Sequence, residues 1–131
     1  NESVVYRKIV GGNIMKIVKQ EQAKKFKYAD TSSVLEYSID LNEKNLDFCI
    51  NEINGRYPEK GYCSNLECEE LCYVLEGNGT IYKRDGELFK FKKGDIIFIH
   101  KEDIYYWEGS FKLAIVCTPA WNKEQCKLFD E

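Results

Sequence analysis

The sequence has little of several features on which common functional sites depend. It contains one histidine, His100, one methionine and two prolines in 131 residues, and a single imidazole excludes a site built from several histidines. No apolar stretch approaches the roughly 20 residues that a membrane-spanning helix requires, and no secretory signal is recognisable at the start. No long run of one charge sign marks a surface for nucleic acid or anionic lipid. We therefore expect a cytoplasmic protein that binds neither nucleic acid nor membrane.

The composition that remains is that of one folded domain. Apolar residues make up 44% of the chain and aromatic residues 14%, while 19 basic and 22 acidic residues leave a net charge of −3. A chain of this size and composition can bury a core of its own. Met15 opens the first charged segment, so we interpret residues 1–14 as an N-terminal extension or a cloning remnant and residues 15–131 as a single domain.

Cysteine, which is rare in most proteins, is abundant in this chain. An even number in a short chain suggests disulfides, but disulfide scaffolds rescue chains too small to form a core. We expect reduced thiols at core and pocket positions. The six are Cys49, Cys63, Cys68, Cys72, Cys117 and Cys126.

From Val34 onward the pattern is that of consecutive antiparallel strands. Short apolar or alternating runs are separated by Gly, Asn and Asp, which are the residues of tight turns. Before them, good helix formers in 16–27 predict a short N-terminal helix; after them, Pro119 ends the last strand and starts a C-terminal arm whose aromatic residues pack on the barrel or a second subunit. The expected strands are 34–39, 46–53, 68–76, 79–83, 88–91, 95–99, 104–108 and 111–117.

The longest irregular stretch, 54–65, exceeds most connections in compact domains. Two interpretations stay open for it, a functional loop or an additional edge strand. If it is a functional loop, Arg56, Tyr57 and Lys60 would recognise an anionic substrate at the mouth of a pocket.

Two blocks of the sequence have the spacing of a known superfamily. Glu70 is followed by six residues and Gly77, and Gly86 is followed by five residues and a turn that ends at Gly94. These blocks resemble the two short motifs of the cupin superfamily, and the resemblance extends over about 34–118. It implies an all-β fold, namely a single cupin-type jelly-roll barrel, here with the short N-terminal helix and the C-terminal arm.

The resemblance also implies where a metal would be held. That superfamily commonly uses three histidines and a glutamate; here Glu70 matches the glutamate, and Cys63, Asn65 and Tyr105 match the histidines. A thiol, an amide and a phenol are a poor replacement for three imidazoles. We expect no cofactor, with a transition metal held by Glu70, Cys63 and Cys72 as the alternative.

Without a metal, the side chains at these positions would line a pocket for a small molecule. On a strand, residues of equal parity share a face, so Glu70 and Cys72 project together, as do Tyr105 and Trp107. The leading hypothesis is a binding site for a small polar molecule, either sugar-like or a carboxylate; equally open is that these residues are core and Glu70 is a satisfied structural carboxylate. The candidate ligand-binding residues are Cys63, Asn65, Glu70, Cys72, Tyr105 and Trp107.

A second hypothesis is enzymatic. Glu70 and Tyr105 would be the acid and base of an isomerase, epimerase or lyase reaction, with burial raising the pKa of Glu70 toward neutrality. His100, in a turn, is expected to be solvated. We also expect a homodimer, in which the first strands and the aromatic tail cover an exposed sheet edge.

Overall fold

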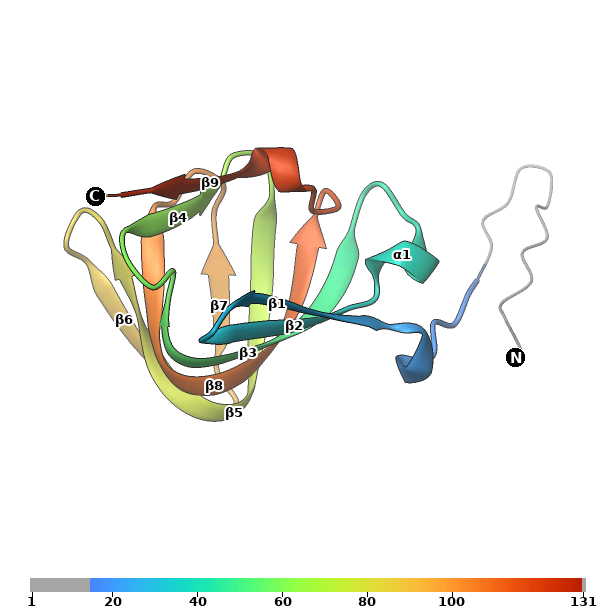
Figure 1. Cartoon of the computed structure of the whole chain (residues 1–131), viewed down its shortest axis with the longest axis horizontal. Coiled ribbons are helices and arrows are strands. Elements are labelled where there is room, and N and C mark those ends of the chain that lie inside the picture. The colour runs from blue at the N-terminus through green and yellow to red at the C-terminus, as the bar shows by residue number, and fades with distance from the viewer. Residues whose placement is uncertain (1–14, 131) are drawn as a thin grey trace.

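The computed structural model describes residues 15–130, and the predicted extension 1–14 lies outside them. The described chain forms one curled antiparallel sheet of nine strands, which bends over on itself into a half-barrel (Figure 1). No helix among these residues has the length and apolar character needed to cross a bilayer. The strands are β1 (Lys24–Ala29), β2 (Ser32–Glu36), β3 (Asp47–Tyr57), β4 (Tyr62–Asn65), β5 (Glu69–Lys83), β6 (Leu88–Lys92), β7 (Ile96–Ile99), β8 (Tyr105–Thr118) and β9 (Cys126–Phe129).

Strand β8 is the centre of the sheet. It pairs along nearly its whole length with β3 on one side and β5 on the other. Buried and more exposed residues alternate along β8, as expected for a strand with one face toward a core. The buried face includes Tyr105, Trp107, Leu113 and Ile115, which belong to the hydrophobic core. The predicted all-β cupin-type fold is therefore confirmed.

The bend in the three long strands is made by glycines. Gly109 on β8 is opposite Gly55 on β3 and Gly79 on β5, so three glycines form one row across the sheet. A Cβ on Gly109 would lie 2.6 Å from the carbonyl oxygen of Asn78, and one on Gly79 would lie 2.7 Å from the Phe111 ring. Side chains at this row would prevent the close approach of the strands, and all three strands are strongly curved (Figure 1).

Two strand breaks predicted at glycines do not occur in the structure. The segment around Gly77 and Gly79 was expected to be a hairpin between two strands, and β8 was expected as two strands separated near Gly109. Both β5 and β8 run through without interruption. Glycine was interpreted as a turn signal, whereas here it lets a continuous strand bend. The predicted turns at Gly86 and Gly94 do connect β5 to β6 and β6 to β7.

The predicted N-terminal helix in 16–27 is wrong. Only one 3-10 turn, Gln20–Gln22, forms there, and β1 begins at Lys24. Pairing with β2 joins Lys24 to Glu36 and Phe26 to Val34, so tertiary pairing overrides the modest helix propensity of the lysines and glutamines. Within residues 15–130 the one α-helix is the short α1 (Ser38–Leu41), which follows β2.

The segment 54–65 contains an additional strand, as one of the two interpretations expected, but this strand lies between β8 and β9 and is not at the edge of the sheet. Its first residues extend β3, and Tyr62–Asn65 form β4, which pairs with β9 over its length and with β8 at Cys63. The C-terminal arm accordingly ends in a strand, after a 3-10 turn at Lys123–Gln125. The arm therefore packs against the sheet by backbone pairing.

Candidate functional site

A polar cavity of about 110 Å³ opens between the two halves of the bent sheet. Five of the six predicted ligand-binding residues line it. The sixth, Cys72, is fully buried in the hydrophobic core and is not one of the lining residues. The five that line the cavity are Cys63, Asn65, Glu70, Tyr105 and Trp107.

One wall of the cavity is acidic. Asp47 on β3 and Glu70 on β5 are both opposite Cys117 on β8, so the three residues form one row on the inner face of the sheet. Glu36 at the end of β2 adds a third carboxyl group to the lining. The lining includes no lysine, arginine or histidine. Within the described chain, the cavity is thus a site of negative potential.

Burial and mutual repulsion keep protons on this wall. The pKa of Glu70 is raised from 4.5 to about 7, mainly by burial; a hydrogen bond with Asn65 lowers it, and the nearby Asp47 and Glu36 carboxyls raise it. Burial is also the main cause that raises the pKa values of Asp47 and Glu36. Glu70 therefore titrates near neutral pH, where a carboxyl group both donates and accepts protons readily.

The orientation of the Asn65 amide is set by a buried glutamine. Gln125 Nε2 donates to Asn65 Oδ1 at 2.8 Å, which leaves the Asn65 amino group to interact with Glu70. Gln125 Oε1 in turn accepts hydrogen bonds from the backbone amides of Glu67 and Cys68, each at 3.1 Å. Gln125 is 3% exposed and was not predicted from the sequence, because its partners are about 60 residues away along the chain.

Replacing Gln125 with leucine is expected to lower the free energy of unfolding by about 2 kcal/mol, because the Asn65 oxygen and two backbone amides lose a buried partner. The same change frees the Asn65 amide to turn, which should move the pKa of Glu70 upward. Urea denaturation measures the first effect and carboxyl ¹³C NMR the second. Gln20→Leu, at an exposed position, is the control; an equal loss in both variants would contradict the role of Gln125.

The opposite wall is formed by a phenol, a thiol and an indole. Tyr105 is 4% exposed, and burial is the main cause that holds its pKa well above the usual value. Burial likewise raises the pKa of the Cys63 thiol. Trp107 packs edge-on against Tyr105 at 5.9 Å between ring centroids and is 3% exposed. Tyr105 and Cys63 are therefore uncharged hydrogen-bonding groups at neutral pH. Trp107 is too deeply buried to present its ring face to a ligand for stacking.

These residues do not fit the metal centre that the superfamily often holds. A metal needs the thiolate of Cys63 and the phenolate of Tyr105, but burial favours the protonated form of each. The remaining matching position, Asn65, has its amide oxygen engaged by Gln125. Residues 15–130 contain no group of three or more His, Cys, Asp or Glu arranged to hold an ion. All six cysteines are free thiols.

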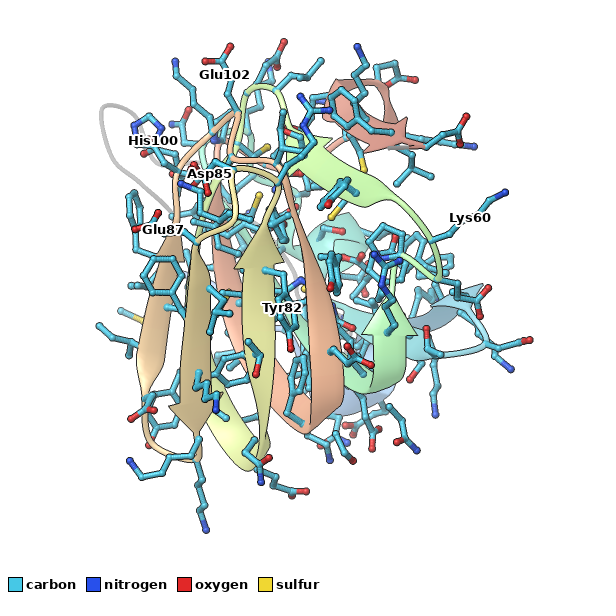
Figure 2. The ribbon with its side chains drawn as sticks, turned by 90° about the vertical axis from the view of Figure 1, so that its left-hand side faces the viewer. Lys60, Tyr82, Asp85, Glu87, His100 and Glu102 are labelled. Carbon is cyan, nitrogen blue, oxygen red and sulfur yellow. The ribbon has the colours of Figure 1, made fainter. Side chains whose placement is uncertain are left out.

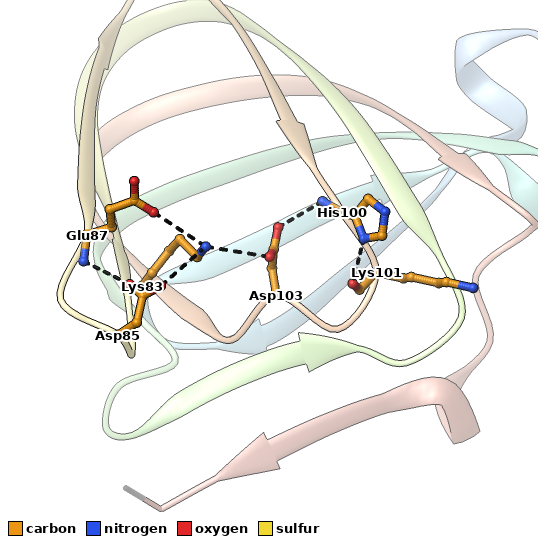
Figure 3. A network of polar contacts seen from close by, with 6 residues as sticks. All are labelled: Lys83, Asp85, Glu87, His100, Lys101 and Asp103. Atoms are coloured by element: carbon orange, nitrogen blue, oxygen red, sulfur yellow. Dashed lines mark hydrogen bonds and ion pairs between the residues drawn. The ribbon is translucent and has the colours of Figure 1, made fainter.

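His100 and Lys60 lie on the surface, away from the cavity lining (Figure 2). The exposed His100 ring lies 3.2 Å from the Glu69 carboxylate. In the network of Figure 3, the backbone amide of His100 donates to Asp103, and the Lys83 ammonium lies 3.5 to 3.8 Å from Asp85, Glu87 and Asp103. This network ties the turn before Tyr105 to β5, which is a structural role.

Arg56 was considered as a residue that recognises an anionic substrate, but it does not line the cavity. Its guanidinium lies 3.7 Å from the centroid of the Tyr106 ring and donates to the carbonyl oxygens of Pro58 and Gly61. It therefore holds the turn between β3 and β4. Tyr57, by contrast, lines the cavity.

Several lining residues were not predicted from the sequence. Tyr28 comes from β1, where a helix was expected, and Trp121 comes from the tail that was expected only to pack. The two rings contact each other at 6.2 Å between centroids, and the Trp121 amide donates to Asp47 at 2.9 Å. Ser64 Oγ also lines the cavity and, among the described residues, is the one buried side-chain polar atom without a hydrogen-bond partner. The tail and the first strand thus complete the site.

Comparison with known proteins agrees with this architecture. Residues 61–114 match the family of EutQ-like cupin domains. The chain has the fold of the cupin superfamily. Pac13 of Streptomyces, a nucleoside dehydratase, superimposes with a TM-score of 0.77 at 15% identity, covering 88% of this cupin and 92% of Pac13. The ectoine synthase of P. lautus superimposes with a TM-score of 0.69 at 14% identity, covering 88% and 90%.

The sequence is also similar to that of an ectoine synthase. This cupin is 27% identical over 79 residues to the L-ectoine synthase of Oceanobacillus iheyensis, and the alignment spans 60% of the cupin and 62% of that relative. The two superpositions establish the fold alone, because identities near 15% do not carry an activity from one cupin to another.

Proposed function

We propose that this cupin binds a small polar molecule in its inner cavity and exchanges a proton with it through Glu70, as isomerases and lyases do. The observation that carries the proposal is the Glu70 carboxyl, whose pKa is raised to about 7 while its residue lines the inner cavity. Titratable groups with this combination are enriched at catalytic sites. The similarity in sequence to an L-ectoine synthase supports an enzyme more than a passive binder.

The charge of the cavity narrows the class of ligand. Three carboxyl groups and no cationic side chain line it, so a carboxylate or phosphate would meet repulsion there, and we propose a ligand that presents hydroxyl or amino groups. The unpartnered Ser64 hydroxyl is available to hydrogen-bond such groups. The Tyr105 phenol, which also lines the cavity, would exchange its hydrogen bond with Cys63 for one with the ligand. A cavity of about 110 Å³ is small for a ligand site, so a larger substrate would place only its reacting end inside.

The two candidate catalytic residues have unequal roles in this proposal. Glu70 moves the proton, since its pKa lies close to neutral pH. Tyr105 stays protonated and donates a hydrogen bond to an oxygen or nitrogen of the substrate as charge develops on it. No metal is required by this scheme, and elemental analysis of the purified protein checks that point: a stoichiometric transition metal that is lost in Glu70→Gln would overturn it.

The test combines binding with isotope exchange. A panel of small amines, polyols and carboxylates is screened by thermal shift, and compounds that bind are incubated with the protein in D₂O and followed by NMR for carbon-bound deuterium or loss of water. Glu70→Gln should keep binding within about tenfold while exchange falls by on the order of 10² or more. Tyr105→Phe should reduce exchange less.

Three outcomes would contradict the proposal. Unchanged exchange in Glu70→Gln would reject the role of Glu70. Binding without exchange or turnover in the unaltered protein would leave a binding protein in place of an enzyme. Preferential binding of carboxylates would reject the class of ligand. Glu76→Gln, on the outer face of the same strand, is the matched control.

A further inference from the structure

One side of the inner cavity places two aromatic rings beside two carboxyl groups. Tyr28, Trp121, Glu36 and Asp47 all line it. The Tyr28 hydroxyl donates to Glu36 Oε2 at 3.2 Å, and the Trp121 backbone amide donates to Asp47 Oδ2 at 2.9 Å. The two rings lie 6.2 Å apart between centroids and are inclined at 65° to each other. Because Tyr28 is 45% exposed and Asp47 only 5%, this group extends from the surface into the cavity.

We propose that these four residues form a subsite for an alkylammonium group, the positively charged end of an organic amine. The inference rests on the proposed function, because it places the charged end of the same ligand in the same cavity. The face of an aromatic ring attracts an organic cation, and a carboxylate supplies the opposite charge. Among residues 15–130, the side chains that line the cavity include no lysine, arginine or histidine to compete with such a group.

A buried hydroxyl group in the same cavity lacks a partner that the ligand would supply. Ser64 is 2% exposed and lines the cavity, and within the described chain its Oγ has no hydrogen-bond partner. Buried polar atoms are nearly always paired, so an unpaired one at a cavity points to a bound group. Asp47 uses Oδ2 for the Trp121 amide, which leaves Oδ1 as an acceptor. An ammonium group carries several N–H donors for acceptors of this kind.

The two carboxyl groups would gain from a nearby positive charge. Burial is the main cause that raises the pKa values of Glu36 and Asp47, and repulsion from Asp47 adds to the shift of Glu36. A cation within a few ångströms favours the ionised form of a carboxyl group and offsets both causes. A neutral hydroxyl group cannot do this. The subsite should therefore bind an amine more tightly than an alcohol of the same size.

The arrangement suits an organic cation better than a metal ion. A metal ion needs several oxygen, nitrogen or sulfur ligands around one point, and residues 15–130 contain no group of three or more His, Cys, Asp or Glu placed to hold one. The ring carbons of Tyr28 and Trp121 are no ligands for a metal. They do contact the alkyl part of an amine favourably.

NMR titration of the ¹⁵N-labelled full chain tests the inference with two matched pairs of probes. Propylamine is compared with propanol, and choline with its neutral isostere dimethylbutanol, so that each pair differs chiefly in the positive charge. Each cation should bind at least about tenfold more tightly than its neutral counterpart. Binding should also shift the resonance of the Trp121 backbone amide, because that amide donates to Asp47.

Asp47→Asn and Trp121→Leu locate the subsite. Asparagine keeps an oxygen that accepts from the Trp121 amide but carries no charge, so cation binding should weaken about tenfold while propanol binding stays the same. Trp121→Leu should weaken choline binding by a similar factor. Glu36→Gln replaces Asp47→Asn if the latter does not fold. The controls are Glu76→Gln and Phe98→Leu, which remove an exposed carboxyl group and an exposed ring elsewhere.

Equal affinities for cation and alcohol in both pairs would overturn the inference. So would cation binding that leaves the Trp121 amide unshifted, or that Glu76→Gln weakens as much as Asp47→Asn, because the cation would then associate with the acidic surface in general. Failure here is distinguishable from failure of the proposed function. Proton exchange on a neutral ligand that depends on Glu70 would reject the subsite alone, whereas a cation bound at Trp121 without exchange would support the subsite and reject the enzyme.

Discussion

Glu70→Gln should remove most of a pH-dependent loss of stability between pH 5 and pH 8. The pKa of Glu70 is about 7 in the folded protein against 4.5 ordinarily, so between these values the folded state holds a proton that the unfolded state releases. Stability from this group is therefore present below pH 4.5 and is lost as pH rises through 7. A shift of this size corresponds to at most about 3 kcal/mol, and glutamine, which does not ionise, removes it.

Urea denaturation of both proteins at several pH values measures the effect. Glu36 and Asp47, whose pKa values are also raised, contribute in the same direction in both proteins, so the difference between the two curves isolates Glu70. Glu76→Gln on the outer face of β5 should leave the pH dependence as it is. Parallel curves for the unaltered protein and Glu70→Gln would show that the Glu70 carboxyl is not held in its protonated form.

Gly77→Ala should destabilise the protein by at least about 3 kcal/mol. Gly77 has a φ of +81° within β5, a conformation that costs an L-residue about 1 to 2 kcal/mol. A Cβ there would also overlap the carbonyl oxygen of Ser110 and lie 2.8 Å from the Phe111 Cα. Because both obstacles are backbone atoms of the central strand, they cannot move aside without disturbing the bend of the whole sheet.

Gly86→Ala separates the two causes. Gly86 has a φ of +102°, but no atom lies within 4 Å of the Cβ position. This variant should therefore show only the conformational cost, and the excess loss in Gly77→Ala measures the close approach of β5 and β8. Equal losses of unfolding free energy in the two variants would mean that the sheet accommodates a side chain at the bend.

The site has one property that the sequence alone did not indicate. Glu70 was expected to be the one carboxyl group of the pocket, yet Asp47 and Glu36 also line it. Burial is the main cause that raises the pKa of Glu70, and these two carboxyl groups add to it. This changes the proposed ligand from one that includes carboxylates to one with hydroxyl or amino groups. The Glu70 carboxyl, with its pKa raised to about 7, both releases and takes up a proton near neutral pH, which suits the pocket to proton transfer.

The spacing of Glu70, Gly77, Gly86 and Gly94 and the alternation of apolar residues were sufficient to predict the cupin fold and most of one cavity wall. Strand parity and motif spacing are local properties that a sequence displays directly. The resemblance to the cupin motifs indicated Cys63, Asn65, Glu70 and Tyr105, strand parity added Trp107, and all five line the cavity.

Only the tertiary structure decided which distant segments complete the site. Tyr28, Asp47, Trp121 and Gln125 reach it through β1, β3 and the C-terminal tail, and their contacts span large separations along the chain. Strand pairing also overrode the local preference for helix in 16–27. At the glycines of β5 and β8, where the sequence predicted turns, the paired strands continue and bend. Local composition determines which strands form, but the energy of long-range pairing and burial decides which side chains share a cavity.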